Sequence, residues 1–397
     1  MKIAPQTDIL KAVAMVGFTT AKETGDSAAR QNPAKEKGES SSMKKFIALA
    51  LALVMALSLV ACGGAAAPAE STPASAPAES AAAPAESFKV GMVTDVGGVN
   101  DKSFNQGAWE GLQALNAENP AIEVAYLESK TDADYAANLE TFVDEGYDLI
   151  VSVGFMLAEA TKASAEANPE QMYAIVDDAS IDLPNVACLM FAQDEASYLV
   201  GLVAGMATES GKVGYVQGMV SESMNMFGCG FIGGVLAANP EAEVLQFNAN
   251  TFGDATVGAT AATDMATKGA DVIFHAAGGT GNGVIEACET NGVKAIGVDK
   301  DQAVELGKPE TIITSAMKRV DVSVRDIVAS AMEGKFTAGI HMYDLTNGGV
   351  DIAPTRDQLT EEMLTAVEDA KAKIIAGEIV VPEKPADLPE GVFTLAE

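Results

Sequence analysis

From Phe88 to the C-terminus, short runs of apolar residues alternate with amphipathic stretches of ten or more residues. This alternation predicts parallel strands joined by helices, because a strand that is covered on both faces is apolar along its whole length. The predicted strands cover residues 89–94, 123–126, 149–153, 172–176, 186–191, 212–216, 243–247, 271–275, 294–298 and 311–315. Helical patterns cover residues 105–116, 135–145, 156–167, 196–208, 225–238, 255–268, 283–291 and 320–333.

Ten strands are too many for one small doubly wound sheet, and they divide into two groups of about five. We therefore expect an α/β protein with two Rossmann-like lobes, each a three-layer α/β/α sandwich. Open parallel sheets bind ligands at the carboxyl ends of their strands. Polar or glycine residues follow five of the strands, at Asp95, Asp177, Gly278, Asp299 and Lys318. Asp and Gly are also ordinary turn residues, but their recurrence on successive strands favours a ligand-binding cleft between the lobes.

The charge balance restricts the possible partners. The 397 residues include 25 Lys and Arg against 56 Asp and Glu, a net charge of −31. This balance argues against nucleic acid, because phosphate binding requires a basic surface. With two His and four Cys in the chain, we expect no zinc site, no disulfide scaffold and no cofactor.

The N-terminal region is predicted to be a targeting signal. Lys44 and Lys45 form a short basic head, and residues 46–61 follow without a charge. This layout is typical of a secretory signal, and the apolar run is shorter than the ~20 residues of a comfortable membrane-spanning helix. We therefore expect residues 43–61 to be a signal peptide, with an uncleaved anchor helix as the alternative.

The end of this run, Leu-Val-Ala-Cys at residues 59–62, resembles the lipobox of bacterial lipoproteins, in which the Cys is lipidated and becomes the new N-terminus. The resemblance makes Cys62 the expected lipidation site and residues 43–61 a lipoprotein signal peptide. Residues 1–42 are then an N-terminal extension or an over-called start. Residues 62–87 are rich in Ala, Pro, Ser and Glu, so we expect the lipidated Cys to be followed by a disordered tether.

Cleavage before Cys62 would leave 17 basic and 51 acidic residues, a net charge of −34. Three cysteines would also remain, Cys188, Cys229 and Cys288, all in apolar or glycine-rich surroundings. An odd number in such surroundings favours small buried hydrophobes over a disulfide or a metal site.

The segment 95–111, DVGGVNDKSFNQGAWEG, is the most informative stretch. Asp101 or Ser103 can cap the helix that is predicted to begin near Asn105. Phe104 lies at the helix mouth, where it is either a hydrophobic staple or a stacking plate for a planar ligand. Trp109 is the only tryptophan, and its helical position favours core packing.

Residues 89–111, KVGMVTDVGGVNDKSFNQGAWEG, look like the opening signature of the basic membrane protein (PnrA-like) family. Further similar motifs lie at 173–178, 184–205, 227–235, 278–284, 295–302 and 314–324, so that the likeness covers 88–397. The family comprises lipoprotein substrate-binding proteins of ABC transporters, several of which bind purine nucleosides. The resemblance implies a type I periplasmic-binding fold with a three-crossover hinge. Lobe one would comprise 88–192 and 316–342, and lobe two 193–315 and 343–397.

The resemblance also implies an aromatic sandwich for a nucleobase. Phe104 would stack on one face of the base, and a Phe from lobe two would cover the other. Phe227 is the preferred second ring, with Phe252 and Phe274 as alternatives. Gly278 would let the backbone approach the sugar without a Cβ in the way.

The resemblance implies that polar side chains complete the site. Asp95, Asn105 and Asp177 would bind the edge of the base. Asp299 and Lys318 would hold the ribose hydroxyls. Lys318 is the one cation expected there, beside three Asp, so the charge pattern itself favours a neutral nucleoside over a nucleotide.

These observations together predict a monomeric, lipid-anchored protein on the outer face of the bacterial cytoplasmic membrane, which delivers a nucleoside to an ABC transporter permease. The alternative is another solute on the same fold, such as riboflavin, a sugar or a signalling molecule. Catalysis is not expected. Residues 278–284 lack the spacing of a dinucleotide fingerprint, and His275 and His341 offer no nucleophile–base pairing.

Overall fold

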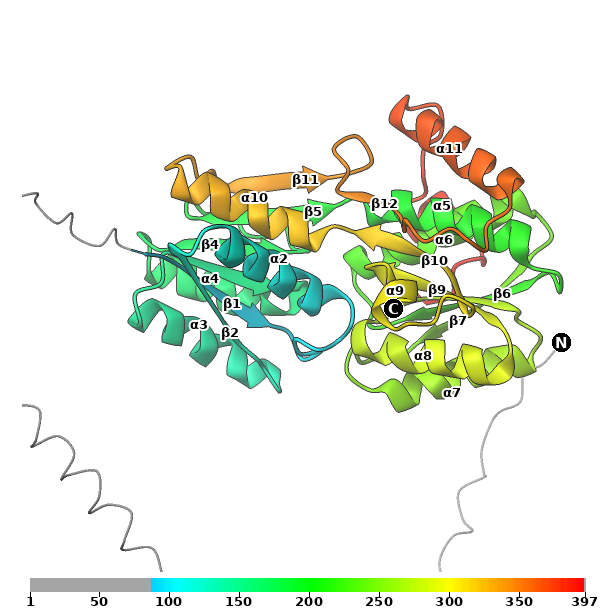
Figure 1. Ribbon diagram of the computed structural model, residues 1–397, viewed down its shortest axis with the longest axis horizontal. Helices are drawn as coiled ribbons and strands as arrows, with labels where there is room; N and C mark the ends of the chain where they lie inside the picture. The colour runs from blue at the N-terminus through cyan, green and yellow to red at the C-terminus, as the bar shows by residue number, and fades with distance from the viewer. Residues whose placement is uncertain (1–86, 396–397) are drawn as a thin grey trace, which may run out of the picture. The chain divides into compact units, whose positions relative to one another are not determined.

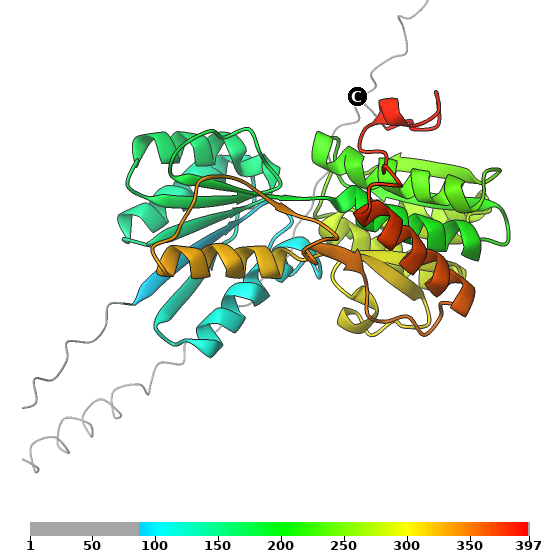
Figure 2. The same cartoon turned by 90° about the horizontal axis from the view of Figure 1, so that it is seen from above.

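The computed structural model describes residues 87–395, which belong to one compact unit (Figure 1). The expectations for the N-terminal extension, the signal peptide, Cys62 and the tether concern residues outside this range. The described residues contain two six-stranded sheets with helices on their faces (Figure 2). None of the helices between residues 87 and 395 has the length and hydrophobicity that crossing a membrane requires.

The first sheet has the strand order β11-β5-β4-β3-β1-β2, and all of its strands pair in parallel. Its strands are β1 (Phe88–Thr94), β2 (Ile122–Leu127), β3 (Leu149–Val153), β4 (Met172–Val176), β5 (Val186–Phe191) and β11 (Gly339–Tyr343). Every residue of β3 is buried, as expected for a strand covered on both faces.

The second sheet has the order β12-β10-β9-β8-β6-β7, and only the edge strand β12 runs antiparallel to its neighbour. Its strands are β6 (Lys212–Gln217), β7 (Glu243–Asn248), β8 (Val272–Ala276), β9 (Lys294–Asp299), β10 (Ile312–Lys318) and β12 (Val350–Ile352). The two sheets confirm the predicted pair of α/β lobes.

The helices that cover the sheets are α2 (Phe104–Glu118), α3 (Tyr135–Asp144), α4 (Ala158–Ala167), α5 (Gln193–Ala207), α6 (Glu222–Ala238), α7 (Ala255–Thr267), α8 (Gly278–Asn291), α9 (Gln302–Glu305), α10 (Val320–Met332) and α11 (Glu361–Ile375). They pack mainly in pairs: α3 with α4, α5 with α6, α7 with α8, and α2 with α10. Helix α5 is buried along almost its whole length.

Glycines let α5 and α6 approach each other closely. A Cβ on Gly234 of α6 would lie 2.0 Å from the backbone oxygen of Tyr198 in α5, and one on Gly201 would lie 2.3 Å from the oxygen of Phe231. Both distances are far inside van der Waals contact. The helix pair therefore depends on the absence of side chains at these two positions.

The chain passes between the sheets three times: after β5, after β10 and between β11 and β12. Strand β10 stays in the second sheet as far as Lys318, so the expected return to lobe one at residue 316 falls inside this strand. Strand β11 stays in the first sheet through Tyr343, the residue at which lobe two was expected to resume. Both switches therefore come later in the chain than the sequence predicted.

Candidate ligand-binding site

A pocket lies at the carboxyl ends of the strands, between residues contributed by the two lobes. Its empty space is about 470 Å³ when the part open to solvent is included, within the range of small-molecule sites. All eight residues that the sequence proposed for a ligand lie in its wall: Asp95, Phe104, Asn105, Asp177, Phe227, Gly278, Asp299 and Lys318. The first four come from the first lobe and the others from the second.

Strand ends position most of the polar groups. Asp95 follows β1, Asp177 follows β4, and Asp299 and Lys318 are the last residues of β9 and β10. Asp177 and Asp299 adopt φ angles of 66° and 63°, in the left-handed region that Asp tolerates better than most residues. The left-handed turn ends the strand at each of these carboxylates, which both lie in the pocket wall.

The pocket contains more aromatic rings than the two that the sequence paired. Phe104 begins α2, and Phe227 lies in α6 with 3% of its surface exposed. Phe252 also lines the pocket, and its ring meets that of Phe155 edge-on with 6.3 Å between centroids. Phe274 is not among the lining residues; it is fully buried, and its ring centroid lies 5.0 Å from that of Phe231. Of the two alternatives to Phe227, only Phe252 therefore faces the pocket.

Lys318 is the buried cation of the site. Its Nζ forms an ion pair with Asp177 Oδ2, and the two side chains are only 2% and 7% exposed. The same nitrogen lies 5.0 Å from the ring centroids of Phe104 and Phe191, and 5.4 Å from that of Phe227. Interactions with a carboxylate and three aromatic rings thus offset the free-energy cost of removing the ammonium group from water.

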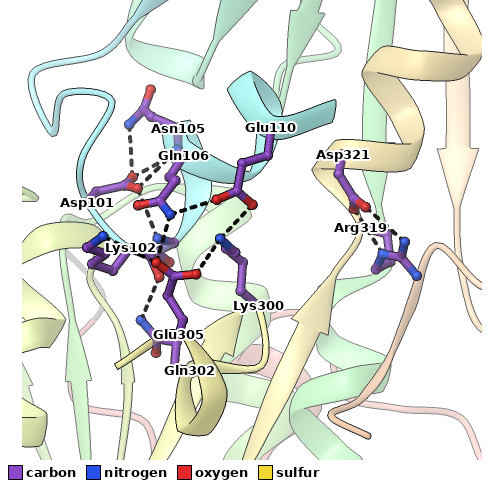
Figure 3. A network of polar contacts seen from close by, with 11 residues as sticks. Asp101, Lys102, Asn105, Gln106, Glu110, Lys300, Gln302, Glu305, Arg319 and Asp321 are labelled. Atoms are coloured by element: carbon purple, nitrogen blue, oxygen red, sulfur yellow. Dashed lines mark hydrogen bonds and ion pairs between the residues drawn. The ribbon is translucent and has the colours of Figure 1, made fainter. Parts of the chain in front are cut away.

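A second polar cluster surrounds the start of α2 (Figure 3). Asp101 accepts hydrogen bonds from the backbone N–H groups of Ser103 (2.9 Å), Asn105 (2.8 Å) and Gln106 (3.1 Å). Asp101 is therefore the residue whose side chain caps the helix. The Ser103 hydroxyl instead donates to Asp299 Oδ2 of the other lobe.

The amide of Asn105 links two carboxylates. Its Nδ2 donates to Asp95 Oδ1 at 2.8 Å and to Asp101 Oδ2 at 3.1 Å. The backbone N–H of Gly97 donates to the same Asp95 oxygen at 2.8 Å. Asp101 was not among the predicted site residues, although it too lines the pocket.

Burial raises the pKa of three carboxyls in the pocket wall, those of Asp95, Asp101 and Asp299. The pKa of Asp95 is raised to about 6, although hydrogen bonds from Asn105 and Gly97 oppose the shift. The pKa of Asp299 is raised to about 7, again by burial, with Lys318 and the Ser103 hydroxyl acting in the opposite direction. Burial also raises the pKa of Asp101. These three carboxyls therefore lie in surroundings that disfavour their charged form.

The glycine-rich run after β8 belongs to the following helix, which begins earlier than the sequence predicted. Helix α8 begins at Gly278, so residues 278–281 form its first turn, and the predicted start at residue 283 is wrong. Gly278 has a φ of 52°, a conformation that Gly adopts without strain. Ala277 and Gly278 both line the pocket, which brings the N-terminus of α8 to its wall.

Outside the pocket, charged side chains join α2 to the segment after β9 (Figure 3). Lys300 contacts Glu110 at 2.7 Å and Glu305 at 2.9 Å. Glu305 also contacts Lys102 at 3.2 Å and accepts a hydrogen bond from Gln106 at 2.8 Å. We call these five residues the rim cluster, because they connect the lobes beside the pocket.

The remaining singled-out residues are structural. Cys188, Cys229 and Cys288 are buried and unbridged, and burial raises the thiol pKa of the latter two to about 12. Trp109 packs edge-on against Tyr126, with ring centroids 4.8 Å apart.

Comparisons with known proteins identify the family. The sequence profile of the family described as "ABC transporter substrate-binding protein PnrA-like" matches residues 88–385. The chain belongs to this PnrA-like family. The predicted resemblance is therefore confirmed, and the chain is an ABC transporter substrate-binding protein.

This PnrA-like chain is similar to two relatives and to one protein of known structure. The "CD4+ T-cell-stimulating antigen" of Listeria monocytogenes is 39% identical over 86% of this chain and 99% of its own length. The "ABC transporter nucleoside-binding protein BmpA" of Lactococcus lactis is 38% identical over 75% of this chain and 90% of its own length. A crystal structure of an ABC transporter solute-binding protein from Aeropyrum pernix aligns with a TM-score of 0.67 at 30% identity, over 75% of this chain and 95% of that chain. Such neighbours confirm the type I solute-binding fold.

Proposed function

We propose that the protein captures a nucleoside, with a purine base preferred, between its two lobes and delivers it to the permease of an ABC transporter. The observation that carries the proposal is a pocket that combines buried phenylalanine rings with hydrogen-bonding carboxylates. Phenylalanine rings suit a flat heterocycle, and carboxylates suit N–H groups and neighbouring sugar hydroxyls. A relative at 38% identity is named as a nucleoside-binding protein, which supports the same class of ligand.

In this proposal Phe104 and Phe227 stack on the two faces of the base. Each good stack of a base on an aromatic ring contributes ~1–3 kcal/mol. Phe252 is the alternative to Phe227, because both side chains belong to lobe two and line the pocket.

The polar side chains divide between base and sugar. Asp95, Asn105 and Asp177 bind the edge of the base. Asp299 and Lys318 bind the ribose hydroxyls, and the missing side chain of Gly278 leaves room for the sugar. Lys318 already pairs with Asp177, so a phosphate would meet the remaining carboxylates without a free cation among the lining residues. A neutral nucleoside is therefore favoured over a nucleotide.

The location follows from the N-terminal sequence. We propose that residues 43–61 are removed as a signal peptide and that lipid on Cys62 anchors a monomer to the outer face of the cytoplasmic membrane. Replacing Cys62 with Ser should release the protein from membranes into the medium or periplasm. A variant that still sediments with membranes after a carbonate wash would refute the lipid anchor.

Ligand binding is tested by thermal shift and isothermal titration with guanosine, inosine, adenosine, cytidine, riboflavin and ribose. A ligand at 100 times its Kd adds ~2.7 kcal/mol of stability, which a thermal shift detects. Stabilisation by riboflavin or ribose alone would favour the alternative of another solute. A shift with none of the nucleosides would refute the proposed function.

Variants locate the ligand. Phe104→Ala and Asp299→Ala should each weaken nucleoside binding at least tenfold while the protein remains folded. Phe247→Ala is the matched control, because its ring lies in β7 and is 40% exposed, away from the pocket. Unchanged affinity in both pocket variants would show that the nucleoside binds elsewhere.

A further inference from the structure

The orientation of the Asn105 amide is determined by its neighbours. Its Nδ2 lies 2.8 Å from Asp95 Oδ1 and 3.1 Å from Asp101 Oδ2. Turning the amide over would place its oxygen against two carboxylate oxygens, and three acceptors cannot share a hydrogen bond. Figure 3 shows the Asn105 oxygen pointing away from Asp101. The two carboxylates therefore hold both donors of this amide on one side.

This arrangement leaves buried acceptors without partners on two residues that line the pocket. Asn105 Oδ1 and Asp177 Oδ1 are buried and have no hydrogen-bond partner among residues 87–395, and both residues line the pocket. In Asp177 the other oxygen binds Lys318. In Asp95, Oδ1 is already engaged, and Oδ2 lies near Gly154 in the pocket wall. Burying an acceptor without a partner is unfavourable, so the pocket favours a ligand that donates to these oxygens.

We propose that this pocket selects bases with adjacent N–H donors on the Watson–Crick edge, an inference that rests on the nucleoside function proposed above. Asp101 is the positioning residue that produces this preference. Guanine carries such donors at N1 and at its 2-amino group. Adenine presents an acceptor at N1, which would face an acceptor of the pocket.

Asp101 is suited to this role because its carboxylate is buried and held in place by hydrogen bonds. It is 2% exposed, and three backbone N–H groups of residues 103–106 hold its carboxylate. Its Oδ2 is the atom that meets the Asn105 amide. In Asp101→Asn, an NH₂ group would replace this oxygen, so the backbone N–H of Asn105 would lose its acceptor. Oδ1 could still accept from Ser103 and Gln106. The new NH₂ group attracts the Asn105 oxygen and thereby favours the opposite amide orientation.

The selectivity is tested on the wild-type protein by isothermal titration with guanosine, 1-methylguanosine and adenosine. We expect guanosine to bind at least tenfold more tightly than either of the others, since the methyl group removes the N1 donor and adenosine replaces it with an acceptor. Adenosine or 1-methylguanosine binding as tightly as guanosine would overturn the inference, although the nucleoside function would stand. Failure of all three to bind would refute the nucleoside function and this inference with it.

The role of Asp101 is tested by the ratio of guanosine affinity to adenosine affinity. Asp101→Asn should lower this ratio several-fold, whereas a purely structural role would weaken both ligands equally. Asp271→Asn is the matched control, because Asp271 also accepts from two backbone N–H groups, those of Glu209 and Ser210. If Asp101→Asn fails to fold, Asp101→Ser retains a capping hydroxyl without a carboxylate for Asn105. An unchanged ratio in a folded Asp101 variant would overturn its positioning role.

Discussion

Replacing Lys318 with Met should be among the most destabilising single changes in the pocket. Met keeps an apolar chain of similar length but removes the ammonium that pairs with Asp177. Removing one partner of a buried ion pair costs about 3–5 kcal/mol, because the other charge stays buried without compensation. The value should lie toward the upper end, since three aromatic rings lose their cation at the same time.

Urea unfolding of the ligand-free protein, followed by circular dichroism, measures this loss. The second half of the test is Asp177→Asn, alone and combined with Lys318→Met. Asn tolerates the left-handed backbone of residue 177, where φ is 66°. Removing both charges should restore most of the stability, to within about 2 kcal/mol of the wild type, because a buried pair is often replaceable by neutral groups.

Two results would refute this reasoning. A loss below 1 kcal/mol in Lys318→Met would mean that Asp177 is not buried as a charged partner. A double variant as unstable as Lys318→Met alone would mean that the loss arises from the missing lysine chain and not from the unpaired carboxylate.

Three further experiments test separate parts of the structure. Gly234→Ala should destabilise the protein by about 2 kcal/mol or more, because the new Cβ would overlap the Tyr198 oxygen. Gly107→Ala should instead stabilise it by about 0.5–1 kcal/mol, because its Cβ would meet no atom within 4 Å. Equal urea midpoints for the two variants would contradict the packing argument. Burial raises the pKa of Asp299 from its usual 3.8 to about 7 in the folded protein. Its contribution to stability is therefore fully present below the pKa of the unfolded chain and is lost as the pH rises through about 7. Melting temperatures between pH 4 and 8 should therefore fall less steeply in Asp299→Asn than in the wild type, and parallel curves would speak against a buried carboxyl. Glu305→Gln weakens the rim cluster, so stopped-flow measurements should show nucleoside released several-fold faster, and an unchanged rate would mean that the cluster does not hold the lobes together.

The apolar strands were the most predictable part of the fold. Strands β3, β4 and β5 begin and end where the sequence placed them. Each is a largely apolar run that starts directly after a polar residue, namely Asp148, Gln171 or Asn185. The edge strands β11 and β12 were missed. The first alternates exposed and less exposed positions, and the second is only three residues long. Helix α11 was missed as well.

The site was predictable where strand ends supply it. Asp95 and Asp299 follow from the rule that ligands bind beyond the carboxyl ends of parallel strands. The same rule would have found Phe155, which lies two residues after β3. This residue falls between the predicted strand at 149–153 and the predicted helix at 156–167, and no role was predicted for it. The role of Asp101 depends on which way an amide turns, and no pattern along the chain contains that information.

The rim cluster and the Lys318–Asp177 pair differ in their contact with water, and this difference has a consequence for ionic strength. Lys102 and Glu110 of the rim cluster are 41% and 45% exposed, whereas Lys318 is 2% exposed. Dissolved ions screen exposed charges over about 8 Å at 0.15 M but reach buried ones poorly. Changes in the ionic strength of the surroundings would therefore change the strength of the contacts that the rim cluster makes between the lobes. The buried ion pair of Lys318 and Asp177 would be affected much less.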